Sequence, residues 1–175
     1  GTLYIDGGKP APGLIETTAR NLRKVSPTMY FNVPRGFDLL MPYLERDEQL
    51  RRNFFSRCRF VFYAGAALPQ NLWDRFVKLA RESADGPVLL VSAWGSTETA
   101  PLATAVPYPV DRAGVIGLPV PGCELKLVPS AGKLEVRLRG PNVTPGYFRR
   151  DDLTAQAFDD EGFYRIGDAL KFVDP

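Results

Sequence analysis

The chain has 175 residues, of which 45% are hydrophobic and 24% charged, a composition typical of a globular protein and not of a disordered one. The 22 basic and 20 acidic residues give a net charge of +2, which argues against a dedicated nucleic-acid-binding protein. No run of about 18 apolar residues is present, so we expect no membrane-spanning segment.

The N-terminal part of the chain carries helical patterns. Apolar residues recur at helical spacing over residues 13–25. A second apolar face covers residues 36–46, where Pro42 is expected to end or kink the helix because proline lacks an amide hydrogen and clashes with the preceding turn. Asp47 can accept a hydrogen bond from a free amide at a helix start, so we expect it to cap a third helix that reaches about residue 55.

A strand–helix–strand unit follows. Residues 60–64 and 88–91 are short, apolar, β-prone runs that are typical of buried strands, and an amphipathic helix begins between them at Pro69. Two strands joined in this way should be parallel, so the loops that follow them, residues 65–67 and 94–99, should lie at the same edge of the sheet. Ligands bind beyond this edge in open α/β sheets, and we therefore expect the two loops to face one crevice.

The second half of the chain has a different pattern. Apolar and polar residues alternate over residues 123–127 and again over 134–139, and a turn at 129–132 separates the two runs. This pattern predicts a β-hairpin with one face exposed to water. We expect an α/β fold in which a parallel-sheet part, residues 1–105, is followed by a small antiparallel β-barrel-like part, residues 106–175.

The loop at residues 94–99 carries groups suited to a nucleotide or a metal ion. Trp94 offers a flat face to a base or an aromatic substrate, and Gly95 would let a ligand approach the backbone. Glu98 could bind Mg²⁺, a hard cation that prefers oxygen ligands. Hydroxyl groups come from Ser96, Thr97 and Thr99. An ordinary strand-to-helix turn with a Ser or Thr cap and an acidic first turn fits the same residues, and composition alone leaves both alternatives open.

The cysteines and the lack of histidine limit the kinds of metal site and catalytic pair that the chain can form. The two cysteines, Cys58 and Cys123, are far apart and lack metal-binding spacing, which is typical of a reduced, cytoplasmic protein without a zinc site. The sequence has no histidine, which excludes Ser–His and Cys–His catalytic pairs within this chain.

Several segments resemble the adenylate-forming superfamily, which includes acyl-CoA synthetases, peptide-synthetase adenylation domains and firefly luciferase. Residues 94–98 (WGSTE) resemble the family's aromatic-Gly-x-Thr-Glu motif. Further similar segments occur in the family's order at residues 63–69 (YAGAALP), 114–122 (GVIGLPVPG), 132–147 (from GKLEVR to GY) and 164–168 (YRIGD). Within the family, residues 5–8, 31–34 and 94–101 are most similar to feruloyl-CoA synthetases.

The resemblance implies a role for each matching residue in nucleotide binding. Trp94 would stack on adenine, and Asp168 would accept hydrogen bonds from both ribose hydroxyls. The nucleotide and acyl crevice would be lined by Gly65, Ala66, Ala67, Gly95 and Ser96. Two departures from the family pattern are mild: Ile166 stands where Thr is usual, and Ala67 stands where Pro is common.

The resemblance also implies the reaction, with ATP and CoA as co-substrates. Thr97 would contact the α-phosphate or the acyl carboxylate, and Glu98 would bind Mg²⁺, so both are candidate catalytic residues. The acid would first form acyl-AMP and then a thioester, and the first step needs positioning and charge neutralisation more than proton transfer.

Parts of the family pattern do not occur in this sequence. No Ser/Thr/Gly-rich phosphate loop ending near a Lys precedes the matching segments, and the mobile C-terminal domain with its catalytic Lys is not represented. The chain also starts at a Gly and ends without a helix cap. We therefore expect it to be the central piece of a larger enzyme and to be inactive without the remainder of that enzyme.

The acid substrate is predicted from fewer residues. Candidate pocket residues are Tyr30, Phe31, Asn32, Val33 and Pro34, although Tyr30 and Phe31 fit a core strand equally well. We expect a hydroxycinnamate-like aromatic acid. The alternatives are a fatty-acid ligase, a stand-alone adenylate-binding module without catalysis, and a structural domain with decayed motifs.

Overall fold

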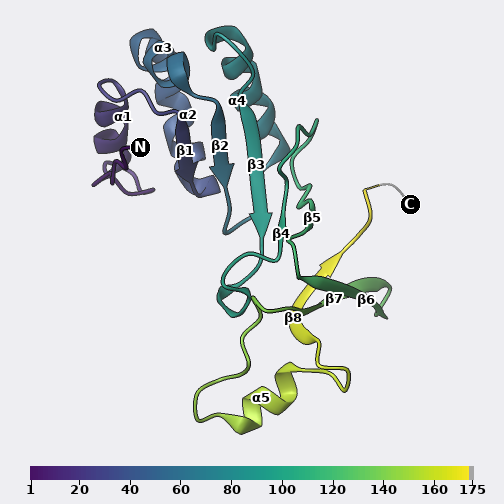
Figure 1. Ribbon diagram of the computed structural model, residues 1–175. Helices are drawn as coiled ribbons and strands as arrows, with labels where there is room; N and C mark the ends of the chain where they lie inside the picture. The colour runs from purple at the N-terminus through teal and green to yellow at the C-terminus, as the bar shows by residue number, and fades with distance from the viewer. Residues whose placement is uncertain (174–175) are drawn as a thin grey trace. The chain divides into compact units, whose positions relative to one another are not determined.

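The structure, a computed structural model, describes residues 1–173 (Figure 1). The C-terminal pair 174–175, where we expected a cut point, lies outside the described residues. Within residues 1–173, no helix combines the length and the apolar character needed to cross a bilayer. In chain order the elements are α1 (Ile15–Leu22), β1 (Met29–Asn32), α2 (Pro34–Arg46), α3 (Glu48–Arg57), β2 (Phe60–Tyr63), α4 (Gln70–Ser83), β3 (Leu89–Trp94), the 3-10 turn η1 (Thr97–Thr99), β4 (Thr104–Ala105), β5 (Leu118–Pro119), β6 (Glu124–Ser130), β7 (Lys133–Arg139), α5 (Asp151–Ala157) and β8 (Tyr164–Leu170).

The chain forms two compact units. The first contains Gly1–Ser92 and Pro107–Val115, and the second contains Ala93–Val106 and the chain from Ile116 onward. The first unit holds parallel strands and the second holds antiparallel strands, which confirms the α/β fold class. The boundary near residue 105 stays a prediction, because a compact unit is not by itself a folding domain.

The first unit is built on three parallel strands. β2 pairs with β1 on one side and with β3 on the other, so that Met29, Phe60 and Leu89 lie in one row of the sheet. The helix α4 connects β2 to β3, as the strand–helix–strand pattern predicted (Figure 1). Val61 and Tyr63 of β2 are buried in the hydrophobic core of this unit. Burial of these alternate residues fixes the register of the strand.

An aromatic cluster fills the core of the first unit. The Phe54 ring packs edge-on against the rings of Tyr30, Phe55 and Phe76, at centroid distances of 5.1, 4.9 and 6.2 Å. Such pairs stabilise a core by about 0.5–1.5 kcal/mol each beyond the area that they bury. The cluster therefore joins α3 to β1 and to α4.

Two expectations about helix ends have different outcomes. Pro42 does not end its helix, because α2 continues to Arg46. The carbonyl that loses its partner belongs to Asp38, an exposed residue at which water can replace the missing amide. Asp47 caps α3 as predicted, since its side chain accepts a hydrogen bond from the backbone nitrogen of Leu50 at 2.9 Å.

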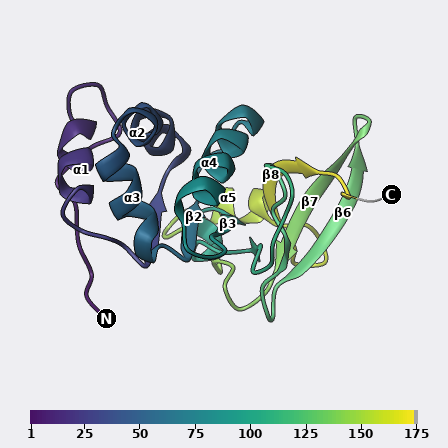
Figure 2. The same cartoon turned by 90° about the horizontal axis from the view of Figure 1, so that it is seen from above.

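The second unit contains a three-stranded antiparallel sheet in which β7 lies between β6 and β8 (Figure 2). The predicted hairpin is confirmed: β6 and β7 pair from Glu124–Arg139 to Ser130–Lys133. Ala131 and Gly132 form the turn with φ angles of 48° and 76°. Positive φ at both central residues is the geometry of a two-residue turn that matches the twist of the strands.

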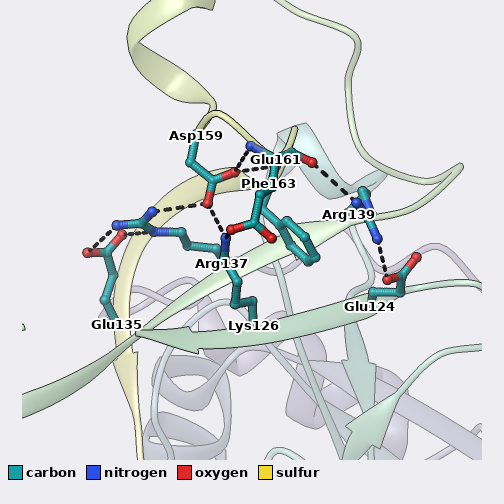
Figure 3. A network of polar contacts seen from close by, with 8 residues as sticks. All are labelled: Glu124, Lys126, Glu135, Arg137, Arg139, Asp159, Glu161 and Phe163. Carbon is teal, nitrogen blue, oxygen red and sulfur yellow. Dashed lines mark hydrogen bonds and ion pairs between the residues drawn. The ribbon is translucent and has the colours of Figure 1, made fainter. Parts of the chain in front are cut away.

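One face of this hairpin carries a network of ion pairs (Figure 3). We expected this face to be open to water, but Glu135 and Arg137 are half-buried. The segment that leads into β8 covers them, since Asp159 from this segment pairs with Arg137 Nη1 at 3.0 Å and with Lys126 Nζ at 2.7 Å. The polar residues occupy this face as the alternating pattern predicted. Their shared ion-pair partner, Asp159, comes from a distant part of the chain.

Asp159 is the centre of the network. Its side chain is only 6% exposed, and its Oδ1 accepts hydrogen bonds from the backbone nitrogens of Glu161 and Phe163. The Lys126 ammonium, together with these amides and Arg137, holds the pKa of Asp159 well below its usual range. Two cations and two amides therefore compensate one carboxylate that is nearly removed from water.

We expect Asp159→Asn to lower the unfolding temperature at neutral pH and to weaken its dependence on acid. The folded-state pKa of Asp159 is depressed, so its contribution to stability is present above the unfolded value of about 3.9 and is lost as the pH falls toward the folded pKa. Thermal melts followed by circular dichroism from about pH 7 downward measure both effects.

Glu161→Gln is the matched control. Glu161 also pairs with Lys126, at 2.8 Å, but its side chain is 68% exposed, and exposed pairs contribute little. Equal shifts of the unfolding temperature in the two variants would contradict the central position of Asp159.

Candidate functional site

The loop after β3 is held by hydrogen bonds between the Thr99 side chain and the Ser96 backbone. Thr99 is fully buried, and its hydroxyl accepts a hydrogen bond from the Ser96 backbone nitrogen at 2.9 Å. At Gly95, a Cβ atom would collide with the backbone oxygen of Pro101. Thr99 thus acts inside the loop, where its hydroxyl also donates to the Ser96 carbonyl at 3.0 Å, and the loop forms a short 3-10 turn, Thr97–Thr99. Both alternatives for this loop, a capped turn and a ligand-binding loop, stay predictions. The contact of Gly95 with a ligand stays a prediction.

Glu98 is held at both carboxylate oxygens. Ser96 Oγ donates to Oε2 at 2.8 Å, and the Tyr147 hydroxyl donates to Oε1 at 3.0 Å. The Ser96 hydrogen bond, followed by a backbone amide and the Tyr147 hydroxyl, lowers the pKa of Glu98. The Glu98 carbonyl also accepts from the Thr144 backbone nitrogen at 2.7 Å, so that both ends of the residue are fixed.

Tyr147 and Tyr164 extend this arrangement. Their hydroxyls lie 3.3 Å apart, and burial raises the pKa of Tyr164. Neither residue was predicted from the sequence to have a role, although both lie in segments that resemble family motifs. The missed signal was a tyrosine in each of two separate motif-like segments, which only the fold brings to Glu98.

The chemistry of this donor set fits Mg²⁺. A carboxylate has about four lone-pair positions, and the two hydrogen bonds to Glu98 leave others for a cation. The residues that the structure describes contain no group of three or more His, Cys, Asp or Glu side chains arranged around a metal position. An ion at Glu98 would thus take its other ligands from phosphate oxygens and water, which is the usual coordination of Mg²⁺ beside nucleotides.

Trp94 and Asp168, which are 74 positions apart in the sequence, meet in the second unit. The indole Nε1 of Trp94 donates to Asp168 Oδ2 at 3.0 Å. Trp94 is the last residue of β3, whereas Asp168 lies in β8. The residue predicted to stack on adenine and the residue predicted to bind ribose are therefore direct neighbours.

Asp168 lies in an irregular part of β8. Between the pairs Glu135–Ala169 and Arg137–Arg165, β7 has one residue and β8 has three, residues 166–168. Gly167 within this bulge has a φ of 88°, a conformation that favours glycine. Bulges turn side chains away from the regular ladder, and Asp168 is exposed to solvent here.

The remaining nucleotide-loop candidates are distributed over both units. Thr97 is exposed in the second unit, while Gly65, Ala66 and Ala67 form an exposed loop of the first unit, in which Gly65 has a φ of 88°. Because the two loops belong to different units, the crevice that they were expected to share stays a prediction.

The five candidate acid-pocket residues lie in β1 and at the start of α2, and their surroundings differ. Tyr30 packs into the aromatic core, where burial raises its pKa to about 12, whereas Phe31 is 58% exposed. Asn32 donates to the Tyr30 hydroxyl at 2.9 Å and accepts from the Val33 backbone nitrogen at 2.9 Å. Pro34 is the buried first residue of α2. Of the five, Phe31 and Val33 are the exposed apolar residues, and their role in a pocket stays a prediction.

Comparison with known proteins identifies the family. Residues 2–148 match the model of the AMP-binding enzyme family. A long-chain-fatty-acid–CoA ligase of Escherichia coli O6:H1 is 30% identical over 97% of this chain and 31% of its own length. The phenylacetyl-CoA ligase epaB of Aspergillus niger is 35% identical over 66% of this chain and 22% of its own length.

A solved structure agrees with this assignment. A malonyl-CoA ligase with methylmalonyl-CoA and AMP bound superposes with a TM-score of 0.70 and 34% identity, over 89% of this chain and 33% of that one. The chain belongs to the AMP-binding enzyme family. It spans about a third or less of the length of the relatives named here.

We expect Tyr147→Phe to raise the pKa of Glu98 toward its ordinary value. A hydrogen bond to the charged carboxylate lowers its pKa, and the substitution removes only the donating hydroxyl. A pH titration followed at the Glu98 carboxyl carbon by NMR measures the shift. Tyr108→Phe, a change at a tyrosine that is 37% exposed in the first unit, is the control. A pKa of Glu98 that is unchanged in Tyr147→Phe would contradict the geometry.

Proposed function

We propose that this chain is the central part of an ATP-dependent acid–CoA ligase. The observation that supports the proposal most directly is the grouping of Glu98, Trp94 and Asp168 in the second unit of a chain from the AMP-binding enzyme family. Glu98 provides a negative charge held by neutral donors, which suits a cation. Asp168 and Trp94 provide an exposed carboxylate beside an aromatic face, which suits a nucleoside.

The proposed reaction has two steps. An oxygen of the substrate carboxylate bonds to the α-phosphorus of ATP while the bond from that phosphorus to pyrophosphate breaks. The CoA thiolate then bonds to the acyl carbon, and AMP leaves with the electrons of the broken carbon–oxygen bond. Neither step needs a histidine, because positioning and charge neutralisation supply most of the acceleration.

Residues of this chain would contribute mainly to orientation. Trp94 would stack on adenine, Asp168 would hold the ribose, and Thr97 would contact the α-phosphate or the acid. Glu98 would hold Mg²⁺, which neutralises phosphate charge when bound. The phosphate loop and the catalytic lysine would come from the remainder of the enzyme, which we place in the cytoplasm because both cysteines are free and buried.

We further propose a hydroxycinnamate-like aromatic acid as the substrate. Segments similar to feruloyl-CoA synthetases and the relative that is a phenylacetyl-CoA ligase support an aromatic acid. The fatty-acid ligase among the relatives favours the second candidate, a fatty acid.

Kinetic assays on the complete enzyme separate these candidates. We expect kcat/KM for ferulate to exceed that for a medium-chain fatty acid by at least about tenfold, which corresponds to about 1.4 kcal/mol of transition-state binding. Release of AMP in the presence of CoA measures both values. A tenfold preference in the opposite direction would assign the enzyme to fatty acids.

The 175-residue chain alone should not make acyl-AMP. It has no phosphate loop and no catalytic lysine of the family type, so ATP should bind without reacting. Formation of pyrophosphate from ATP and an aromatic acid measures this prediction, with the complete enzyme as the positive control. Turnover by the chain alone would overturn the fragment interpretation, whereas binding of AMP without turnover in the complete protein would favour an adenylate-binding module.

A further inference from the structure

The contact between Trp94 and Asp168 goes beyond the separate roles proposed for these two residues. The indole Nε1 donates to Asp168 Oδ2 at 3.0 Å, so a neutral donor holds a charged acceptor. A hydrogen bond to an ionised acceptor is stronger than one between neutral groups. A phenylalanine or tyrosine ring at position 94 could stack on a base but has no N–H group at its edge.

The surroundings of the pair give its two members different freedom. The Trp94 ring is partly buried against the core of the second unit, which also contains Val136 and Leu138. Asp168 is exposed, and it belongs to a bulge that begins after Arg165 and contains Gly167 at a φ of 88°. A packed ring therefore restrains a carboxylate that the backbone alone would leave on an irregular, exposed segment.

The hydrogen bond leaves Asp168 able to accept from a ligand. An ionised carboxylate has about four lone-pair positions, and Trp94 uses one of them on Oδ2. Among residues 1–173, no other hydrogen bond to this carboxylate is found, which leaves the Oδ1 atom and the second position on Oδ2 for hydroxyl donors. Two adjacent hydroxyls, as on a ribose, match the spacing of the two oxygens of one carboxylate.

We infer that the Trp94 N–H positions Asp168 for the ribose hydroxyls, so that base stacking and ribose recognition are coupled through one indole ring. The inference rests on the proposed nucleotide-binding function and adds a second role to Trp94. Trp94 is thus a positioning residue for the carboxylate as well as a surface for the base. Loss of the Trp94 N–H should weaken the binding of nucleotides that carry ribose hydroxyls more than the binding of nucleotides that lack them.

NMR of the 175-residue chain tests the bond before any ligand is added. The chain has two tryptophans and therefore two indole N–H signals. Trp73 is the internal reference, because its indole N–H is buried in the first unit without a hydrogen-bond partner among the described residues. Asp168→Asn should shift the Trp94 signal and leave the Trp73 signal in place. An unchanged Trp94 signal would overturn the inference.

Titrations with AMP and with 2′,3′-dideoxy-AMP, followed at the Gly167 amide, test the coupling. The original chain should bind AMP about tenfold more tightly than it binds 2′,3′-dideoxy-AMP. Trp94→Phe should lower the affinity for AMP by at least about fivefold. The affinity for the dideoxy nucleotide should change much less, because that nucleotide has no hydroxyls for Asp168 to bind. Equal weakening of both nucleotides would mean that Trp94 acts only by stacking, and would overturn the inference while leaving the proposed function intact.

Two further outcomes are decisive. If Trp94→Phe does not show the spectrum of a folded chain, Asp168→Asn is titrated in its place. Asp168→Asn should bind AMP and 2′,3′-dideoxy-AMP equally, and a retained preference for AMP would overturn the inference. If the original chain binds neither nucleotide at millimolar concentrations, and the complete enzyme does not bind AMP either, both the proposed function and the inference are wrong.

Discussion

The change of pairing partner along β3 is the constraint on which the candidate site depends. Residues Leu89–Ser92 of this strand pair parallel with β2, whereas Ala93 and Trp94 pair antiparallel with β4. Backbone hydrogen bonds at both ends leave the strand little freedom at the point where it enters the loop that carries Glu98. Trp94 is thereby fixed in its backbone by Thr104 and in its side chain by Asp168.

Three carboxylates of the second unit are held in two different ways. Lys126 and Arg137 neutralise Asp159, which is almost inaccessible to solvent. Glu98 and Asp168 receive hydrogen bonds only from neutral groups among the contacts described above, so no cation among these contacts compensates them. This difference separates a structural carboxylate from two that can attract a cation or bind hydroxyl groups.

The irregular backbone of the second unit lies next to the candidate residues Asp168 and Glu98. The bulge at Gly167 turns Asp168 out of the ladder, and Ala100 at a φ of 57° ends the turn that carries Glu98. A left-handed conformation costs free energy at Ala100, whereas Gly167 adopts it without that cost. The hydrogen bonds from Ser96, Tyr147 and Trp94 offset part of this cost while they orient the carboxylates.

The sequence by itself determined the parts of the fold that depend on short-range patterns. Short apolar, β-prone runs located the strands β2 and β3, and periodic patterns located the helix α4 and the hairpin β6–β7. Asp47 was identifiable as a cap because capping is local. Family motifs also pointed to Glu98 and Asp168 as candidate residues.

Only the tertiary structure decided which groups these residues contact. Tyr147 lies 49 positions from Glu98 and Asp168 lies 74 positions from Trp94, and no local pattern links residues so far apart. Pro42 stays within α2, and the residue four positions earlier is exposed to water, which the helical pattern alone did not decide. Long-range contacts arise when whole elements pack, so partners, burial and pKa shifts depend on the folded chain rather than on sequence spacing.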